Sequence, residues 1–196
     1  MRTMTITGAK GGVGTSTIAC AVALTLAKQG SNVSLRTSNE YGSTAELAAM
    51  LGMTTPVVTD SGEGRWTEVG DTSLTLTSGF LSRVPQACEW DIIDNDAKRP
   101  IDAAVRVLVV RNDYGSLQRA TTWWKHRYTH LVLVREPHRA LDKRDIIAAT
   151  GHEGLTIIEH DPAIARAIDA GLLTARLPVQ LNLATDVLLS RPGVRA

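Results

Sequence analysis

Short apolar runs alternate with stretches of helical periodicity along most of the chain. The runs predict buried strands at residues 4–6, 33–35, 88–93, 105–110, 131–134 and 155–158. The helical spacing predicts helices at residues 15–29, 43–51, 116–127, 140–150, 162–169 and 181–189. This alternation is typical of an α/β fold, and we expect a doubly wound, mostly parallel sheet with helices on both faces.

Two segments depart from this alternation. Residues 53–64 are polar and rich in turn-forming residues, which predicts a surface loop. Residues 66–69 and 74–77 alternate apolar and polar side chains about the Gly70-Asp71 pair, which predicts a half-exposed hairpin or an edge strand. Neither a repeat nor a linker interrupts the pattern, so we expect a single domain over residues 1–196.

The first apolar run leads into a glycine-rich loop and then into a helix. Gly11, Gly12 and Gly14 can adopt backbone conformations that aim several main-chain N–H groups at one anion. The helix that begins at Thr15 adds the positive end of its dipole. We therefore expect a phosphate group at this junction.

The same loop matches the P-loop pattern GxxxxGK[ST] only in part. Ala9 stands at the first glycine position and Thr15 at the lysine position, whereas Ser16 keeps the hydroxyl position. A lysine lies instead near the start of the loop, at Lys10. The run from Lys10 to Thr17 resembles the deviant Walker A motif KGGxGxx[ST] of the ParA/MinD family.

The resemblance implies a protein that binds ATP and Mg²⁺ and forms a homodimer when the nucleotide is bound. In that family the early lysine reaches across the dimer interface to the partner's nucleotide, which implies a catalytic role for Lys10. The hydroxyl of Ser16 is implied to bind Mg²⁺. The residues implied to bind the nucleotide are Lys10, Gly11, Gly12, Val13, Gly14, Thr15, Ser16 and Thr17.

An acidic strand end at residues 90–97 resembles the Walker B region of the same family, in which an Asp holds Mg²⁺ through water. The spacing from the Trp90-Asp91 pair favours Asp96, which we take as the predicted metal ligand. The end of the apolar pair Ile92-Ile93 favours Asp94 instead. Ligands of open α/β sheets bind at the carboxyl ends of strands, where both carboxylates are expected.

Two later segments extend the resemblance. A strand and a helix pack beside the nucleotide site of the family, and residues 106–111 and 116–120 are similar to them. A later segment of the family closes over the base, and residues 159–167 are similar to that segment. The last likeness implies nucleotide contacts for Asp161 and Pro162. Both residues also fit helix initiation, with Asp161 as the N-cap and Pro162 at the first helical position.

Two departures from the family bear on catalysis. Active ParA-like proteins carry an Asp after the second strand that orients the attacking water, but no Asp occurs between Lys28 and Asp60, and Glu40 is the candidate substitute. Thr15 removes the cation that neutralises charge on the β- and γ-phosphates. Because such electrostatic stabilisation lowers a barrier by several kcal/mol, we expect weak or absent ATP hydrolysis.

The charge distribution suggests a partner. The formal net charge is only +1, but residues 119–144 hold seven basic and two acidic side chains. Such an excess of basic side chains fits binding to a phosphate backbone. The resemblance also implies non-specific DNA binding on this side of the fold. The alternative is a basic helix face that only contacts solvent. The candidate DNA contacts are Arg119, Lys125, Arg127, Arg139, Lys143 and Arg144.

Cysteine usage and apolar run lengths indicate the compartment. Cys20 and Cys88 lack metal-binding spacing, and no apolar run is long enough for a membrane span. We therefore expect a cytoplasmic protein with reduced thiols, which associates with the nucleoid if it binds DNA.

The resemblance implies a partition protein of a plasmid, phage or chromosome, with a centromere-binding adaptor protein as a further partner. The alternative is a MinD-like or pilus-type positioning protein that acts through protein partners at a cell pole or membrane. The Pro192-Gly193 pair after the last expected helix argues against direct membrane insertion.

Overall fold

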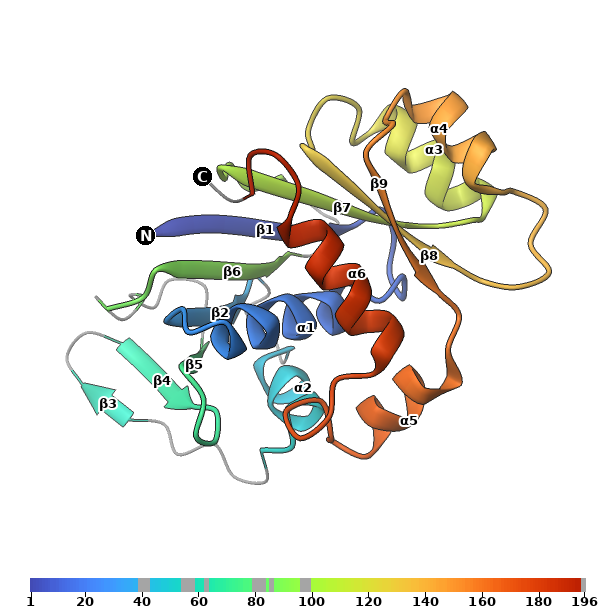
Figure 1. The fold of residues 1–196 in the computed structure, drawn as a ribbon. Helices are drawn as coiled ribbons and strands as arrows, with labels where there is room; N and C mark the ends of the chain where they lie inside the picture. Colours follow the sequence, from blue (N-terminus) through green and yellow to red (C-terminus); the bar gives the residue numbers. More distant parts are fainter. Residues whose placement is uncertain are drawn as a thin grey trace.

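A single sheet forms the centre of the computed structural model (Figure 1). The structure describes residues 1–38, 43–53, 59–61, 64–78, 84, 87–95 and 100–194. Within these residues nine strands are hydrogen-bonded in the order β3-β4-β5-β2-β6-β1-β7-β8-β9. The strands are β1 (Arg2–Gly8), β2 (Val33–Thr37), β3 (Thr59–Ser61), β4 (Gly64–Glu68), β5 (Leu74–Ser78), β6 (Trp90–Asn95), β7 (Val105–Arg111), β8 (His130–Arg135) and β9 (Leu155–Glu159).

The strands from β5 across to β9 run parallel, which confirms the expected doubly wound sheet. β1 lies between β6 and β7, and Ile6 is opposite both Asp94 and Val107. The carboxyl ends of these three neighbouring strands therefore meet at one edge, where ligands of such sheets bind.

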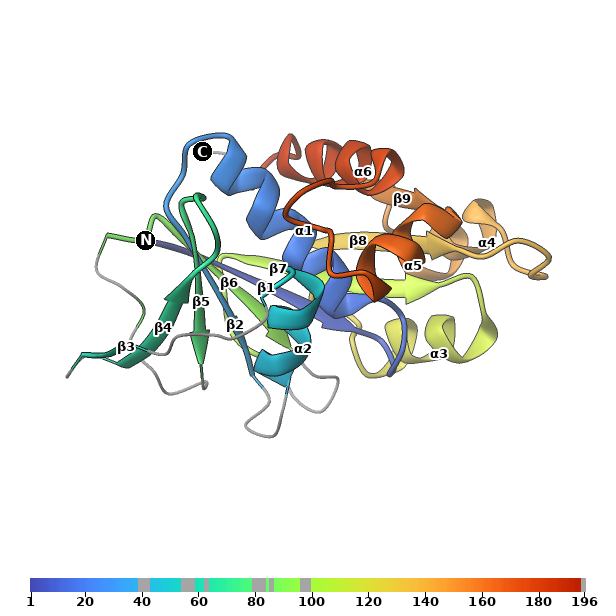
Figure 2. The ribbon, with the colours of Figure 1, turned by 90° about the horizontal axis from the view of Figure 1, so that it is seen from below.

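Helices cover both faces of this sheet. They are α1 (Thr15–Lys28), α2 (Ser43–Met50), α3 (Tyr114–Thr122), α4 (Lys143–Thr150), α5 (Pro162–Asp169) and α6 (Val179–Leu189). α1, α2 and α6 contribute to one apolar core, and α3 and α4 contribute to a second. Figure 2 shows α6 and α3 on opposite sides of the strands. Among the described residues, no helix combines the length and apolar character needed to cross a membrane.

Burial on both faces explains why the strands read as continuous apolar runs. On β7, Val107 and Val109 face the core built with α1 and α6, whereas Leu108 and Val110 face the core built with α3 and α4. All four side chains are almost completely buried. The middle of this strand, Val107–Val110, is therefore apolar on both faces, which is the usual state of a parallel sheet.

The edge beyond β5 differs in part from the sequence prediction. The hairpin is confirmed, because β4 and β5 pair antiparallel, with Trp66 opposite Thr77. However, β5 is not an edge strand, since it also pairs with β2, and its Leu74 and Leu76 are buried. The predicted loop is wrong at Thr59–Ser61, where β3 pairs with β4. Main-chain pairing at a sheet edge requires no apolar side chain, so the apolar pattern gave no signal for β3.

Two helices are shorter than predicted. α3 ends at Thr122, and in the turn that follows Trp124 is buried in the second core while Trp123 is exposed. α4 begins at Lys143, because the Asp142 side chain caps it by accepting hydrogen bonds from the main chain of Arg144 and Asp145. This cap fixes the start of α4 three residues after the predicted one.

Candidate functional site

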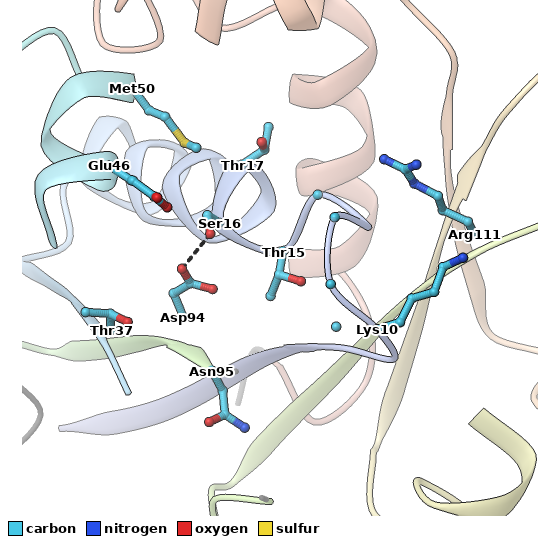
Figure 3. A pocket seen from close by; sticks show the side chains of 14 residues that line it. Lys10, Thr15, Ser16, Thr17, Thr37, Glu46, Met50, Asp94, Asn95 and Arg111 are labelled. Atoms are coloured by element: carbon cyan, nitrogen blue, oxygen red, sulfur yellow. Dashed lines mark hydrogen bonds between the residues drawn. The ribbon is translucent and has the colours of Figure 1, made fainter. Parts of the chain in front are cut away.

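The glycine loop after β1 opens into a cavity of about 460 Å³ (Figure 3). Gly12 and Gly14 have φ angles of 74° and 95°, the left-handed region that glycine adopts without strain. Gly14 is the N-cap of α1 and has no side chain to cover the first turn, so the amides there face an incoming anion. The loop and helix residues that line the cavity are Gly8, Lys10, Gly11, Gly12, Gly14, Thr15, Ser16 and Thr17.

Ser16 and Asp94 meet at the inner wall of this cavity. The Ser16 hydroxyl donates a hydrogen bond of 2.7 Å to the Asp94 Oδ2 atom, from the first turn of α1 to the end of β6. Asp94 is only 6% exposed. A hydroxyl and a carboxylate beside a phosphate loop are the hard oxygen ligands that Mg²⁺ prefers. Asp96, the ligand favoured by spacing, lies outside the described residues.

Gly8 is a requirement that the sequence reasoning missed. A Cβ atom at this position would lie 2.5 Å from the Thr15 Oγ1 atom, 2.8 Å from a Val13 methyl and 2.9 Å from the Lys10 carbonyl oxygen. The loop therefore folds back over Gly8, and Thr15 fills the space beside it. The glycine-rich pattern could have included Gly8, but only the close approach of the loop shows why a side chain is excluded.

Lys10 is bound within its own chain. Its ammonium group lies 2.9 Å from the carboxylate oxygens of Asp113, which is the N-cap of α3. Burial alone would raise the pKa of Asp113, but the hydrogen bonds from Lys10 and Ser116 together with the Lys10 charge lower it below its ordinary value. Asp113 is therefore a carboxylate that holds the early lysine away from the inner wall of the cavity.

Arg111 lies in the segment 106–111 that the resemblance placed beside the nucleotide site, but sequence reasoning gave this side chain no role. It ends β7 and lines the cavity opposite Ser16 and Asp94, and its guanidinium group points toward the glycine loop (Figure 3). Its Nη1 atom lies 2.7 Å from Glu136 Oε1. An arginine directly after an apolar strand was the available signal, but such a residue is usually solvated.

A more apolar cavity of about 280 Å³ adjoins the first one. Gly14, Thr17 and Arg111 line both. Its walls come from the ends of β8 and β9 and from α5, with apolar side chains such as Val13, Ile18, Val134, Ile158, Ile164 and Ile168. An elongated ligand with a charged end and an apolar end fits this pair of cavities.

Asp161 and Pro162 lie on the rim of the apolar cavity, as the sequence suggested. Asp161 is the N-cap of α5 and accepts a hydrogen bond of 2.8 Å from the Ala163 amide. Pro162 occupies the start of the helix. Helix initiation is thus confirmed, and a contact with a base stays a prediction.

The far wall of the first cavity comes from β2 and α2. Thr37 ends β2, and Glu46 and Met50 project from α2 (Figure 3). Glu46 and Asp94 are the carboxylates that line the cavity among the described residues. Glu40, the substitute acid suggested by the sequence, lies outside those residues.

α2 is joined to the segment after α5 through the backbone. A Cβ atom on Gly52 would clash with the Gly171 carbonyl oxygen. The Thr174 hydroxyl donates a hydrogen bond of 2.8 Å to the Leu51 carbonyl. The segments that directly follow α2 and α5, whose helices line the two cavities, are therefore in direct contact.

The six candidate DNA contacts are all exposed, but they divide between two edges of the sheet. Lys125 and Arg127 precede β8 and lie at its amino end, and Arg119 lies on α3. The other three, Arg139, Lys143 and Arg144, follow β8 and lie toward the carboxyl edge, the edge that carries the glycine loop. Arg139 is paired with Glu136, its Nε atom lying 2.7 Å from Oε2.

Comparison with known proteins agrees with this geometry. A family model described as ParA, NUBPL iron-transfer P-loop NTPase, matches residues 1–90. No curated protein matches the chain.

Solved structures share the fold along nearly the whole chain. The MinD cell division protein of Aquifex aeolicus is 17% identical, with 95% of this chain and 94% of that chain covered and a TM-score of 0.77. A ParA family ATPase of Chlorobium tepidum is 18% identical, with 96% of each chain covered and a TM-score of 0.73.

A third similar structure is a putative plasmid partition protein of Borrelia burgdorferi bound to AMPPNP. It is 13% identical, covers 95% of this chain and 96% of that chain, and has a TM-score of 0.70. At these identities the structures show a common fold, and the family model adds the sequence of the loop and its strand. The chain thus has the fold of ParA/MinD-type P-loop NTPases along nearly its whole length, and residues 1–90 also match the ParA family in sequence.

Proposed function

We propose that this protein binds ATP with Mg²⁺ and acts as a nucleotide-dependent dimer in DNA partition. The observation that carries the proposal is the 2.7 Å hydrogen bond between Ser16 and Asp94 at the inner wall of the glycine loop. A hydroxyl and a buried carboxylate are held together where the triphosphate would end. An ordinary strand-to-helix turn does not require a hydroxyl and a buried carboxylate at this position.

The residues present fit Mg²⁺. Ser16 would hold the ion through its hydroxyl, and Asp94 would hold it directly or through water. When bound, Mg²⁺ neutralises the charge of the phosphate oxygens. The loop amides from Gly11 to Thr17 bind the phosphates, and the apolar cavity beside Val134 and Ile164 accepts the base.

The proposal includes slow hydrolysis of ATP. Thr15 brings no positive charge to the phosphates, and Thr37 brings no carboxylate at the end of β2. Glu46 is the remaining acid of the described cavity wall that could orient a water molecule. The protein would therefore keep its ATP-bound state for a long time, which suits a switch better than a rapid enzyme.

Nucleotide binding is tested by titration calorimetry with ATP in the presence and absence of Mg²⁺. Ser16→Ala and Asp94→Asn each remove one proposed ligand and should weaken Mg²⁺-dependent binding by at least about tenfold, while binding without Mg²⁺ changes little. Asp71→Asn, in the exposed turn after β4, is the matched control. Absence of any heat or thermal stabilisation with the native protein would reject the nucleotide site.

DNA binding is supported by the basic residues beside α4. Arg139, Lys143 and Arg144 lie toward the same edge as the nucleotide site, so a dimer that closes over ATP would present them together. The test is an ATP-dependent, salt-sensitive shift of non-specific duplex DNA. The triple alanine variant of these residues should lose the shift, and Lys125→Ala with Arg127→Ala should reduce it less. A centromere-binding adaptor protein is the further partner of this proposal.

A second candidate function is positioning through a protein scaffold, in the manner of MinD-like or pilus-type proteins. α6 favours it, because Val179, Leu183 and Val187 form a stripe on one helix face and are between 44% and 63% exposed. Apolar stripes of this kind often bind other proteins. If the native protein binds ATP but does not shift DNA at low salt, this candidate replaces partition.

A further inference from the structure

The position normally held by the P-loop lysine carries Thr15, yet a different cation stands beside the loop. The Ala9 amide donates a hydrogen bond of 2.8 Å to the Val109 carbonyl, which fixes the loop against β7. Arg111 follows two residues later on the same strand. It lines both the cavity of the glycine loop and the apolar cavity, so it lies at the junction between them.

The guanidinium group of Arg111 has donors to spare. Its Nη1 atom contacts Glu136 Oε1 at 2.7 Å, but its Nε atom is buried and has no acceptor among the described residues. A buried donor without an acceptor is costly, and a native protein seldom keeps one without a reason. Once the side chain turns toward the cavities, a phosphate oxygen at their junction would be the missing acceptor.

Glu136 does not depend on Arg111 for its partner. Arg139 donates to Glu136 Oε2 from its Nε atom at 2.7 Å. The hydrogen bond from Arg139 is the main cause that lowers the pKa of Glu136, and the charge of Arg111 adds to it. Arg111 can therefore turn toward a ligand while Glu136 stays paired as a carboxylate.

Lys10 cannot take this role within the same chain without leaving Asp113, which holds it at 2.9 Å. We propose that Arg111 binds the phosphate chain of the nucleotide where it passes from the glycine loop to the apolar cavity, and thereby supplies the positive charge that Thr15 does not. The guanidinium fork suits this task, because it matches phosphate oxygens with two parallel hydrogen bonds. The inference rests on the proposed nucleotide site.

The experiment is a double-mutant cycle read by titration calorimetry with ATP and Mg²⁺. Arg111→Met should weaken ATP binding about 10- to 100-fold, and Arg111→Lys, which keeps the charge but loses the fork, should weaken it less. In a Thr15→Lys background the loss caused by Arg111→Met should shrink to about threefold or less. Thr15→Met provides the same chain length without charge and should leave the loss unchanged. Lys28→Met, at the exposed far end of α1, controls for the overall change in charge.

Three results would overturn the inference. These are native affinity in Arg111→Met, an equal loss in the Thr15→Lys and Thr15→Met backgrounds, and an equal loss in Lys28→Met. Thermal unfolding of each variant distinguishes a loss of binding from a loss of folded protein. If Arg111→Met does not fold, the double-mutant cycle is measured with Arg111→Lys instead. If the native protein itself binds no ATP, the proposed function fails, and this outcome is distinct from native binding that ignores Arg111.

Discussion

The ammonium group of Lys10 lies 2.9 Å from both carboxylate oxygens of Asp113, which joins the glycine loop to the start of α3. Asp113 also accepts hydrogen bonds from the Ser116 amide and hydroxyl, so one carboxylate serves as helix cap and as lysine partner. Lys10 lines the cavity, but its ammonium group is thus held on the Asp113 side of it. For Lys10 to reach a nucleotide, in its own chain or in a partner, this contact has to break.

Asp113→Asn should favour the nucleotide-bound dimer. The amide oxygen of Asn still caps α3, but the charge that holds Lys10 is gone, so the ammonium group is released. We expect ATP-dependent dimers at several-fold lower protein concentration in sedimentation velocity, and a loss of stability of at most about 1 kcal/mol. Asp142→Asn changes the cap of α4 away from the loop and is the control. Weaker dimerisation in Asp113→Asn would contradict a restraining role for the contact.

The same carboxylate predicts a particular response to acid. The pKa of Asp113 in the folded protein lies below its ordinary value of 3.8, so its stabilising contribution is complete above that value. The contribution is lost as the pH falls through the lower, folded-state pKa. The difference in unfolding free energy between native protein and Asp113→Asn should therefore be constant from pH 7 to about pH 5 and shrink toward pH 3. A difference that grows on acidification would show that the pKa is raised instead.

Gly8→Ala should disrupt the loop, because the new methyl group would lie 2.5 Å from Thr15 Oγ1 and 2.9 Å from a backbone carbonyl. We expect a loss of about 1–3 kcal/mol in unfolding free energy, typical of overpacking, together with loss of ATP binding. Gly11→Ala is the matched comparison, since its Cβ would meet nothing within 4 Å. Urea unfolding should leave Gly11→Ala close to native. Equal stability of the two variants would show that the loop does not fold back over Gly8 as described.

His130 should make the protein sensitive to mild acid. Burial lowers its pKa below the ordinary 6.5, the hydrogen bond with the Pro192 carbonyl opposes this, and His152 and Arg191 lower it further. Its neutral form therefore stabilises the fold fully above pH 6.5, and the contribution is lost as the pH falls through the lower, folded-state pKa.

Urea unfolding at pH 8 and pH 5 tests the role of His130. His130→Gln should lose less stability between these values than the native protein does. His126→Asn, at an exposed position with a φ of 61° that Asn tolerates, should keep the native pH dependence. An unchanged pH dependence in His130→Gln would assign the acid sensitivity to other groups.

The sequence predicted the parallel strands and the glycine loop well, because burial on both faces of the sheet leaves a clear apolar pattern. Its spacing favoured Asp96 as the metal ligand and left Asp94 as the alternative. The apolar pair before Asp94 marks the end of the strand, but the pairing with Ser16 depends on how α1 packs over β6. Only the structure supplies that contact for Asp94.

Pairs of residues that lie far apart along the chain could not be predicted from the sequence. Arg111 ends β7 and Glu136 directly follows β8, and Lys10 and Asp113 are more than a hundred positions apart. Their pairing follows from the order of β1, β7 and β8 in the sheet, which no local pattern contains. The sequence analysis did not identify Glu46 as a cavity residue, because it considered only the apolar side chains of the helix that became α2.

The contact between Gly52 and Gly171 ties the end of α2 to the segment after α5. Neither position tolerates a side chain without pushing the two backbones apart. α2 carries Glu46 and Met50 on the wall of the glycine-loop cavity, and the segment after α5 carries the exposed side chain of Leu172. One wall of the cavity and this outer surface therefore share a single rigid backbone junction.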